Sequence, residues 1–552
     1  MLYGNVTLFY LIPLFLVPIL YYFLYSDKNY FGRTNLILVL FFCLSLSLIT
    51  VIGIYKFPYD IDSIYTTQSV LLMISKGFST QMFSVFPEDF LLKATYPLPI
   101  NSILASSMTL LTGISYTFIV KYMSLIIMGL FFFSYYTFLS KYFNNKVALI
   151  SPLLIASFPL VINMGGIFQN VVLAFLFVFL SWILLFEQYF SKKRFSIAIL
   201  LLILVSTFAL THHLTFTVFI LSLIIILIVI YLIKFLDVKL VDMKIPTNFE
   251  NVILYASIIV LAYYTFVYFS PLSAVLKTFN TQLIHEAASV TAPTTWTLNV
   301  IIQRIGFVIF LLISMIFSIS YIKKIIEIKE NTNKYIFSKQ LLFLILGIVI
   351  LAFSFVGPFF HFPYSWDRTS IFGWIFLIPA TISLIDEYNL KNKFLKVIIV
   401  LSVAFLIFGN IYALPSNILD HRGDAKYDGS FKNWETNQEY FSAKWLNENS
   451  INKTFEADGT FNRVYSVMDP ISLQNNYSYS LMGKYYTFKI LNNDYNNVTF
   501  TYLIIRSENR FYLTGGSSSK MDNLTPNSIN KMFSDPKMDL VYNNNEVSIL
   551  VK

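Results

Sequence analysis

The sequence predicts a mostly α-helical, polytopic membrane protein that ends in a small α/β domain outside the membrane. Hydrophobic residues make up 56% of the 552 residues and charged residues only 12%, whereas a soluble domain carries about 25% charged residues. Apolar runs long enough to cross a bilayer recur along the chain and stop near residue 412. The low charge and the recurring runs together exclude a soluble globular protein.

The apolar runs define a transmembrane domain over residues 1–412. About twelve spans of roughly 20 residues fit into it. They are expected near residues 7–25, 35–55, 117–140, 147–162, 168–188, 195–210, 213–234, 251–270, 300–322, 339–357, 369–386 and 394–412.

Loop charges decide how the chain crosses the membrane around residues 99–113, an apolar segment that is short for a span. If this segment lies at the outer surface and residues 117–140 cross, almost every basic loop becomes cytoplasmic, as membrane proteins prefer. These loops are residues 141–146, 192–194, 234–244, 323–339 and 386–393. This arrangement explains most of the net charge of +9 without a nucleic-acid partner. It also makes residues 56–116 a large outer loop of a multi-pass cell-membrane protein.

The composition changes after residue 412, and residues 413–552 are expected to form the extracytoplasmic α/β domain. Long apolar runs end there, and Asn, Asp, Ser and Tyr become common. The segment at residues 437–450 has its aromatic residues near helical spacing, which predicts a helix. Strand-like runs follow, and the last of them predicts a β-hairpin that turns around residues 543–545.

Two acids in the first outer loop, Asp60 and Asp62, are the strongest candidates for catalysis. They follow a predicted span closely, and acidic residues so near the hydrocarbon are costly and are usually functional. One of them could deprotonate an acceptor hydroxyl as a general base. Alternatively, the two carboxylates could hold a divalent metal such as Mg or Mn against a phosphate. The alternative without function is a solvated, charged loop.

Basic residues at predicted outer ends of spans are candidates for binding a lipid-linked phosphate. Arg368 lies at the outer mouth of a span, where its planar guanidinium would match phosphate oxygens, or would simply anchor the interface. Arg304 lies about one turn inside a span and needs an anionic partner there. The pair His212 and His213 could bind phosphate or a metal, could serve as a proton shuttle, or could make only local hydrogen bonds at a helix end.

The first outer loop and the segment after it resemble the GT-C glycosyltransferases. The resemblance rests on the Asp60 and Asp62 motif, an amphipathic stretch at residues 82–96, the sequence Tyr96-Pro97-Leu98-Pro99, and an apolar helix that ends in Thr112-Gly113. Residues 106–160 are also similar to the next portion of these enzymes, and an outer domain after the last span is common among them. The likeness in layout extends over most of the chain. Among prokaryotes, the layout fits the cell-surface glycosylation enzymes of archaea best.

GT-C enzymes take sugars from polyprenyl- or dolichyl-phosphate carriers. The resemblance therefore implies a lipid-phosphate-sugar donor and an acceptor that is a glycan, a lipid or a protein of the cell envelope. Tyr96, His285 and Glu286 of the outer loops are candidates for contacting the acceptor; for His285 and Glu286, in the loop at residues 270–299, the alternative that the sequence favours is a mobile solvent loop. The tryptophan-rich WWDYG-type signature of oligosaccharyltransferases is missing, and the nearest string is SWDRT at residues 365–369. This absence favours transfer of a single sugar. The competing interpretations are a transporter or flippase of a lipid-linked sugar, and a non-catalytic scaffold with an outer binding domain.

Overall fold

The computed structural model describes part of the chain as an assembly of helices and a C-terminal sheet. The described residues are 100–158, 161–162, 170–190, 194–235, 239–240, 249–266, 298–332, 336–356, 366–388, 399–407, 437–449, 455–456, 502–506, 533–544 and 547–551, with single residues at 37, 39, 40, 43, 67, 70, 71, 73 and 74.

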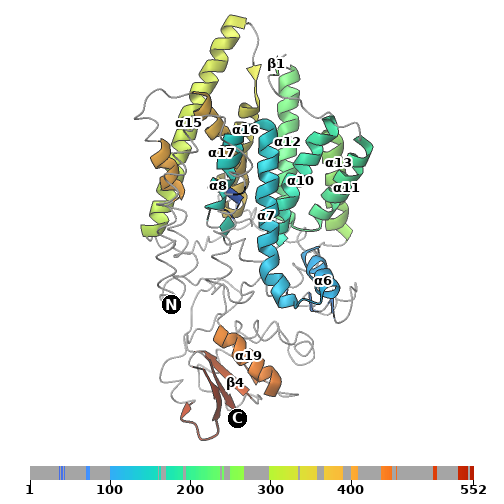
Figure 1. Ribbon diagram of the computed structural model, residues 1–552, viewed down its shortest axis with the longest axis vertical. Coiled ribbons are helices and arrows are strands. Elements are labelled where there is room, and N and C mark those ends of the chain that lie inside the picture. Colours follow the sequence, from blue (N-terminus) through green and yellow to red (C-terminus); the bar gives the residue numbers. More distant parts are fainter. Residues whose placement is uncertain are drawn as a thin grey trace, which may run out of the picture.

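Most of the described helices run roughly along the long axis of the molecule and form a bundle (Figure 1). Their bounds are α6 Ile100–Thr112, α7 Tyr116–Tyr142, α8 Asn145–Ala156, α10 Asn170–Phe190, α11 Arg194–Ala209, α12 His213–Phe235, α13 Phe249–Phe266, α15 Leu298–Thr332, α16 Lys339–Val356 and α17 Trp366–Glu387.

Helices α7, α12, α15 and α17 are each long and apolar enough to cross a membrane. Six shorter apolar helices accompany them in the described part of the chain, which makes this a mostly helical, multi-pass membrane protein. The helix expected at residues 117–140 is confirmed as α7, and its crossing of the membrane stays a prediction. The total of about twelve spans stays a prediction, because the runs at residues 7–25 and most of 35–55 lie outside the described residues.

The predicted C-terminal ends of two spans are wrong. The span expected at residues 147–162 is the shorter helix α8, which ends at Ala156. Pro159 follows closely in the sequence, and a residue before proline is disfavoured in the helical conformation. The span expected at residues 300–322 continues as α15 to Thr332, because its last turns contain Lys, Glu and Ile and no glycine or proline that would end a helix.

Helix α17 is the centre of the bundle. Of its membrane-length window, 89% is buried, compared with 33% of that of α15. Helix α16 packs against α17 so closely that a Cβ atom on Gly347 would lie 2.8 Å from the backbone nitrogen of Leu377. Glycine is therefore required at this crossing, as is common where membrane helices approach each other without the hydrophobic effect of water.

Aromatic side chains fill the contact between α7, α10 and α17. The rings of Phe175 on α10 and Phe372 on α17 are stacked with centroids 4.8 Å apart. The ring of Phe179 lies 4.9 Å from that of Tyr135 on α7. The hydroxyl of Tyr135 donates a hydrogen bond of 2.7 Å to the backbone oxygen of Ile375. This bond satisfies a polar group that would otherwise be unpaired in the apolar core.

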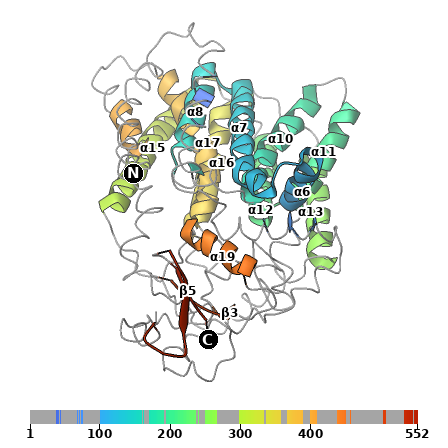
Figure 2. The same cartoon turned by 60° about the horizontal axis from the view of Figure 1, so that its bottom comes forward.

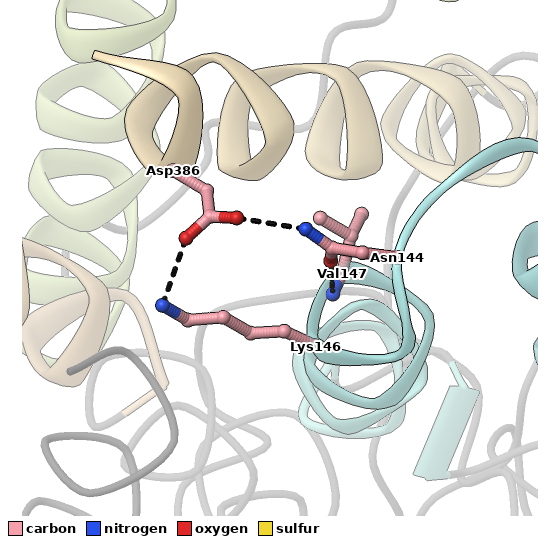
Figure 3. Close-up of polar contacts among 4 residues, drawn as sticks. All are labelled: Asn144, Lys146, Val147 and Asp386. Atoms are coloured by element: carbon pink, nitrogen blue, oxygen red, sulfur yellow. Dashed lines mark hydrogen bonds and ion pairs between the residues drawn. The ribbon is translucent and has the colours of Figure 1, made fainter. Parts of the chain in front are cut away.

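One end of the bundle, here called the basic end, is joined by polar contacts among Asn144, Lys146, Lys324, Asp386 and Glu387. Lys146 Nζ lies 2.9 Å from Asp386 Oδ1, and Asn144 Nδ2 donates to Asp386 Oδ2 at 2.7 Å (Figure 3). Lys324 Nζ lies 2.7 Å from Glu387 Oε1. The first residues of α8 and the last residues of α15 and α17 are thereby held together.

A strand pairing brings α12 to the same end. Strand β1 (Lys239–Leu240), shortly after α12, pairs in parallel with β2 (Ile336–Phe337), shortly after α15. Together with the ion pairs, this pairing gathers four of the loops that were predicted to be cytoplasmic, at residues 141–146, 234–244, 323–339 and 386–393, at the basic end. The grouping of these loops is confirmed, and their assignment to the cytoplasm stays a prediction.

The opposite end, here called the domain end, carries α6 and the start of α7. Gly113 has a φ of 70°, a left-handed conformation that glycine adopts without strain, and it makes the turn between the two helices. With 13 residues, α6 is about 20 Å long, which is shorter than the roughly 30 Å hydrocarbon core. This length fits the prediction of a helix that does not span, and the side on which it lies stays a prediction.

The C-terminal part of the chain forms a helix and a four-stranded sheet. The helix is α19 (Asn437–Asn449), as predicted, and the strands are β3 (Phe455–Glu456), β4 (Tyr502–Arg506), β5 (Asp539–Asn543) and β6 (Val547–Val551). The strand order is β3-β4-β6-β5. Strands β5 and β6 are the antiparallel hairpin that the sequence predicts.

Helix α19 lies between the bundle and the strands (Figure 2). Asn544, in the turn of the hairpin, donates to the backbone oxygen of Gln438 at 2.8 Å and lies 3.0 Å from the Ser442 hydroxyl. The predicted domain boundary at residue 412 lies outside the described residues.

Candidate functional site

The acidic pair Asp60 and Asp62 lies outside the part of the chain that the structure describes, and so do Tyr96, His285 and Glu286. Their roles stay predictions. The described candidates are His212, His213 and the backbone positions of the two arginines.

Both arginines belong to the halves of their helices that point toward the domain end. Arg368 is in the first turn of α17, whose last residues are held at the basic end by Lys146 and Lys324. Arg304 is near the start of α15, whose Lys324 is also at the basic end. The fold therefore brings these two positions, 64 residues apart in the sequence, to the same end of the bundle.

Four helices present their first turns at the domain end, whereas α8 and α16 begin at the basic end and run the opposite way. Helices α7, α12, α15 and α17 all begin there and end at the basic end. The start of a helix carries about half a positive charge because its first N–H groups are unpaired within the helix. At the other end Lys141 stands in the last turn of α7, where a cation complements the partial negative charge.

His212 caps the first turn of α12 at the domain end. Its ring is 9% exposed, and its Nδ1 accepts a hydrogen bond of 3.2 Å from the backbone N–H of Thr215. The hydroxyl of Thr215 lies 2.7 Å from the same nitrogen. Because Nδ1 accepts the backbone proton, the neutral ring carries its own proton on Nε2. Nδ1 of His212 thus makes local hydrogen bonds at the helix end, and the predicted roles of this residue in binding a phosphate or a metal or in moving a proton stay predictions.

The role of His213 in phosphate binding stays a prediction. It is the first residue of α12, which places it at the domain end with His212. Among the described residues there is no group of three or more His, Cys, Asp or Glu residues that could hold a metal. The predicted Mg or Mn site involves Asp60 and Asp62 and is untested.

One polar residue at this end was missed by the sequence analysis. Asn101, in the first turn of α6, is completely buried, and neither its amide nitrogen nor its amide oxygen has a hydrogen-bond partner. The signal in the sequence is an asparagine inside an otherwise apolar run directly after Pro99. Such a residue is ordinarily taken as a surface residue of a short helix.

No family model and no curated protein matches the sequence. Solved structures of the oligosaccharyltransferase of Archaeoglobus fulgidus do resemble it. The structure with a tethered acceptor peptide that contains the NVT sequon has a TM-score of 0.50 at 11% identity, over 87% of this chain and 70% of that one. The apo form gives 0.49 at 11% identity over the same shares.

The complex of the same enzyme, AglB, with an inhibitory peptide and a dolichol-phosphate gives a TM-score of 0.42 at 11% identity, over 87% of this chain and 70% of that one. The likeness at 0.50 concerns the fold alone, and it extends over both the bundle and the C-terminal part of the chain. This chain thus has a fold similar to that of the oligosaccharyltransferase of Archaeoglobus fulgidus.

Proposed function

We propose that this protein is a membrane glycosyltransferase that moves a sugar from a polyprenyl-phosphate donor to an acceptor of the cell envelope. The observation that carries the proposal is the gathering of Arg304, Arg368 and His212 at the domain end of a bundle with the oligosaccharyltransferase fold. Fold alone does not define activity, but the unpaired N–H groups in the first turn of α17, where Arg368 lies, suit a lipid-linked phosphate.

The donor phosphate would meet the guanidinium of Arg368 or of Arg304, since both present several N–H donors to phosphate oxygens. The acceptor would approach from the C-terminal sheet, because α19 lies at the domain end. In the neighbouring structure an acceptor peptide is tethered to the enzyme, which supports a protein as one kind of acceptor here.

One of Asp60 and Asp62 would remove the proton from the acceptor hydroxyl or amide, and the acceptor would then displace the phosphate from the sugar. The loop with these acids leads into α6, which lies beside the start of α7 at the domain end (Figure 1). A positioned base contributes about 10²–10⁴-fold in rate. The alternative role, a divalent metal held by both carboxylates, remains open.

Transfer of one sugar, instead of a whole oligosaccharide, is the finer part of the proposal. It rests on the missing WWDYG-type signature, since the nearest string, SWDRT, falls at the start of α17. The mass of the product distinguishes the two cases, because the acceptor gains the mass of one sugar in the first and of a complete glycan in the second.

The test uses the full-length protein in lipid nanodiscs, dolichyl-phosphate monosaccharides with a labelled sugar, and membranes of the source cells as acceptor. Transfer is expected with the wild type. The Asp60→Asn and Asp62→Asn double variant should bind the donor and transfer nothing. Wild-type transfer rates in the double variant would overturn the proposed mechanism. Movement of labelled donor across vesicle membranes without any transfer would instead identify a flippase.

A chelator decides between the two roles of the acids. If Asp60→Asn and Asp62→Asn each abolish sugar transfer and the chelator abolishes transfer by the wild type, the pair holds a metal. If only one of the two variants abolishes transfer and the chelator has no effect, the residue replaced in that variant is the base.

A further inference from the structure

The side chain of Asn101 is a polar group whose burial nothing in the described structure explains. It is 0% exposed, and both ends of its amide lack a hydrogen-bond partner. Buried polar groups in native proteins are nearly always hydrogen-bonded, so an unpaired one calls for a specific reason. The amide has room for two donated hydrogen bonds and two accepted ones.

Asn101 lies in the first turn of α6, as the second residue of the helix. The backbone N–H groups of a first turn have no partner within the helix. The rest of the buried face of α6 consists of Ser102, Ala105 and Ser106. Small residues of this kind let a helix pack closely against its neighbours.

The chemistry of the amide selects the ligand. Phosphate oxygens only accept hydrogen bonds, so a phosphate would satisfy Nδ2 and would leave Oδ1 facing negative charge. A hydroxyl both donates and accepts. Neighbouring hydroxyls of a sugar ring would therefore satisfy both ends of the amide at once.

We propose that Asn101 and the start of α6 bind the hydroxyl groups of a sugar ring. The sugar is that of the lipid-linked donor or that of a glycan acceptor, and this assignment rests on the proposed glycosyltransferase function. Because the side chain is fully enclosed, α6 must shift for the sugar to reach it. The amide then selects the sugar by hydrogen bonds to its hydroxyl groups, while the phosphate is held elsewhere at the domain end.

The central variant is Asn101→Leu, which replaces the unpaired amide with an apolar side chain of similar size. Removing a buried unpaired polar group should leave the thermal midpoint of the full-length protein in nanodiscs unchanged or raise it. If Asn101 binds sugar, the same variant should bind dolichyl-phosphate glucose, galactose or mannose about tenfold more weakly. Its affinity for dolichyl phosphate without a sugar should not change.

Ser181 in the middle of α10 provides the matched control. Its hydroxyl is also completely buried and unpaired. Ser181→Ala should therefore resemble Asn101→Leu in stability and the wild type in sugar binding. Asn101→Ala is the second variant at the site itself. If the sugar belongs to the acceptor, the variants weaken binding of a free oligosaccharide and leave the donor affinities unchanged.

Three results would overturn the assignment. One is a wild type that binds no sugar-bearing lipid or free oligosaccharide better than the bare lipid. The second is Asn101→Leu with wild-type affinities for all of these probes, which would indicate a buried water at most. The third is loss of the fold in both Asn101 variants, which would give the amide a structural role. Binding is measured without turnover, so a failed transfer assay would refute the proposed function and leave this result standing.

Discussion

The Lys146 ammonium lies 2.9 Å from the Asp386 carboxylate and joins the first turn of α8 to the last turn of α17. The other oxygen of the same carboxylate accepts from Asn144, whose own side-chain oxygen caps α8 by accepting from Val147 N–H at 3.0 Å. The Asp386 carboxylate thus binds both the residue that caps α8 and a lysine, which lie about 240 residues earlier in the sequence. The ion pair with Lys146 is partly buried, which distinguishes it from a surface ion pair.

Replacing Asp386 with Ala should destabilise the protein by about 1–3 kcal/mol, because a charge-assisted pair is lost and the Lys146 ammonium keeps its charge in a site where its side chain is only 12% exposed. Glu387→Ala is the matched control, since its pair with Lys324 is exposed, with side-chain exposures of 36% and 48%. It should cost about 1 kcal/mol or less. Thermal unfolding of the full chain in detergent measures both, and equal shifts would contradict the assigned difference.

Gly347→Ala should destabilise the contact between α16 and α17. The new Cβ would lie 2.8–2.9 Å from the backbone N and Cα of Leu377, and a backbone cannot move away cheaply, so a cost of about 1–3 kcal/mol is expected. Gly306→Ala is the comparison, because its Cβ would lie 3.1 Å or more from the backbone of Phe405 and Leu406, a contact that small shifts relieve. Thermal midpoints should fall further for Gly347→Ala, and the reverse order would refute this account.

The helices were predictable where a single apolar run carries the signal. The expected span at residues 213–234 is α12, which begins at His213 and ends at Phe235. The close approach of Gly347 to Leu377 was not predictable, because it depends on which helices are neighbours. For the site, the sequence proposed Arg304 and Arg368 but missed Asn101, since the burial of a polar side chain depends on which segments pack around α6 in three dimensions.

The sidedness of the membrane helices gives a labelling prediction. A cysteine in place of Thr112, which is exposed at the domain end, should react with a membrane-impermeant thiol reagent added to intact cells. A cysteine in place of Lys141, exposed at the basic end, should react only after the cells are opened. The native Cys43 is buried and should stay silent. The opposite pattern of reactivity would invert the predicted topology.

The C-terminal helix and sheet should fold as a separate unit. Expressed as residues 420–552, they should unfold cooperatively, because α19 packs on β6 and the rings of Trp445 and Tyr542 lie 5.1 Å apart. Asn544→Ala should lower the unfolding free energy by about 1–2 kcal/mol, since its amide ties α19 to the hairpin. Glu448→Ala, which removes only an exposed contact of 3.9 Å to Lys444, should change it by a few tenths of a kcal/mol. A melt without a transition would count against an independent domain.

Arg368 is the residue on which the proposed donor site depends most directly. Its place in the first turn of α17 puts it at the domain end, where the unpaired N–H groups of that turn favour an anion. Arg368→Ala should remove charge-assisted hydrogen bonds worth about 1.5–3 kcal/mol, which weakens donor binding roughly ten- to hundredfold. Arg368→Lys should restore part of the affinity, because an ammonium binds phosphate as a point charge without the planar fork.

Lys324→Ala controls for the loss of one positive charge, because Lys324 pairs with Glu387 at the basic end, at the far end of the bundle from Arg368. It should leave the affinity for dolichyl phosphate unchanged, whereas a general effect of net charge would weaken binding equally in both variants. Binding of dolichyl phosphate to full-length protein in nanodiscs is the measurement. An unchanged affinity in Arg368→Ala would remove this residue from the phosphate site. The same titration of Arg304→Ala would then decide whether the second arginine, which α15 brings to the same end, holds the phosphate in its place.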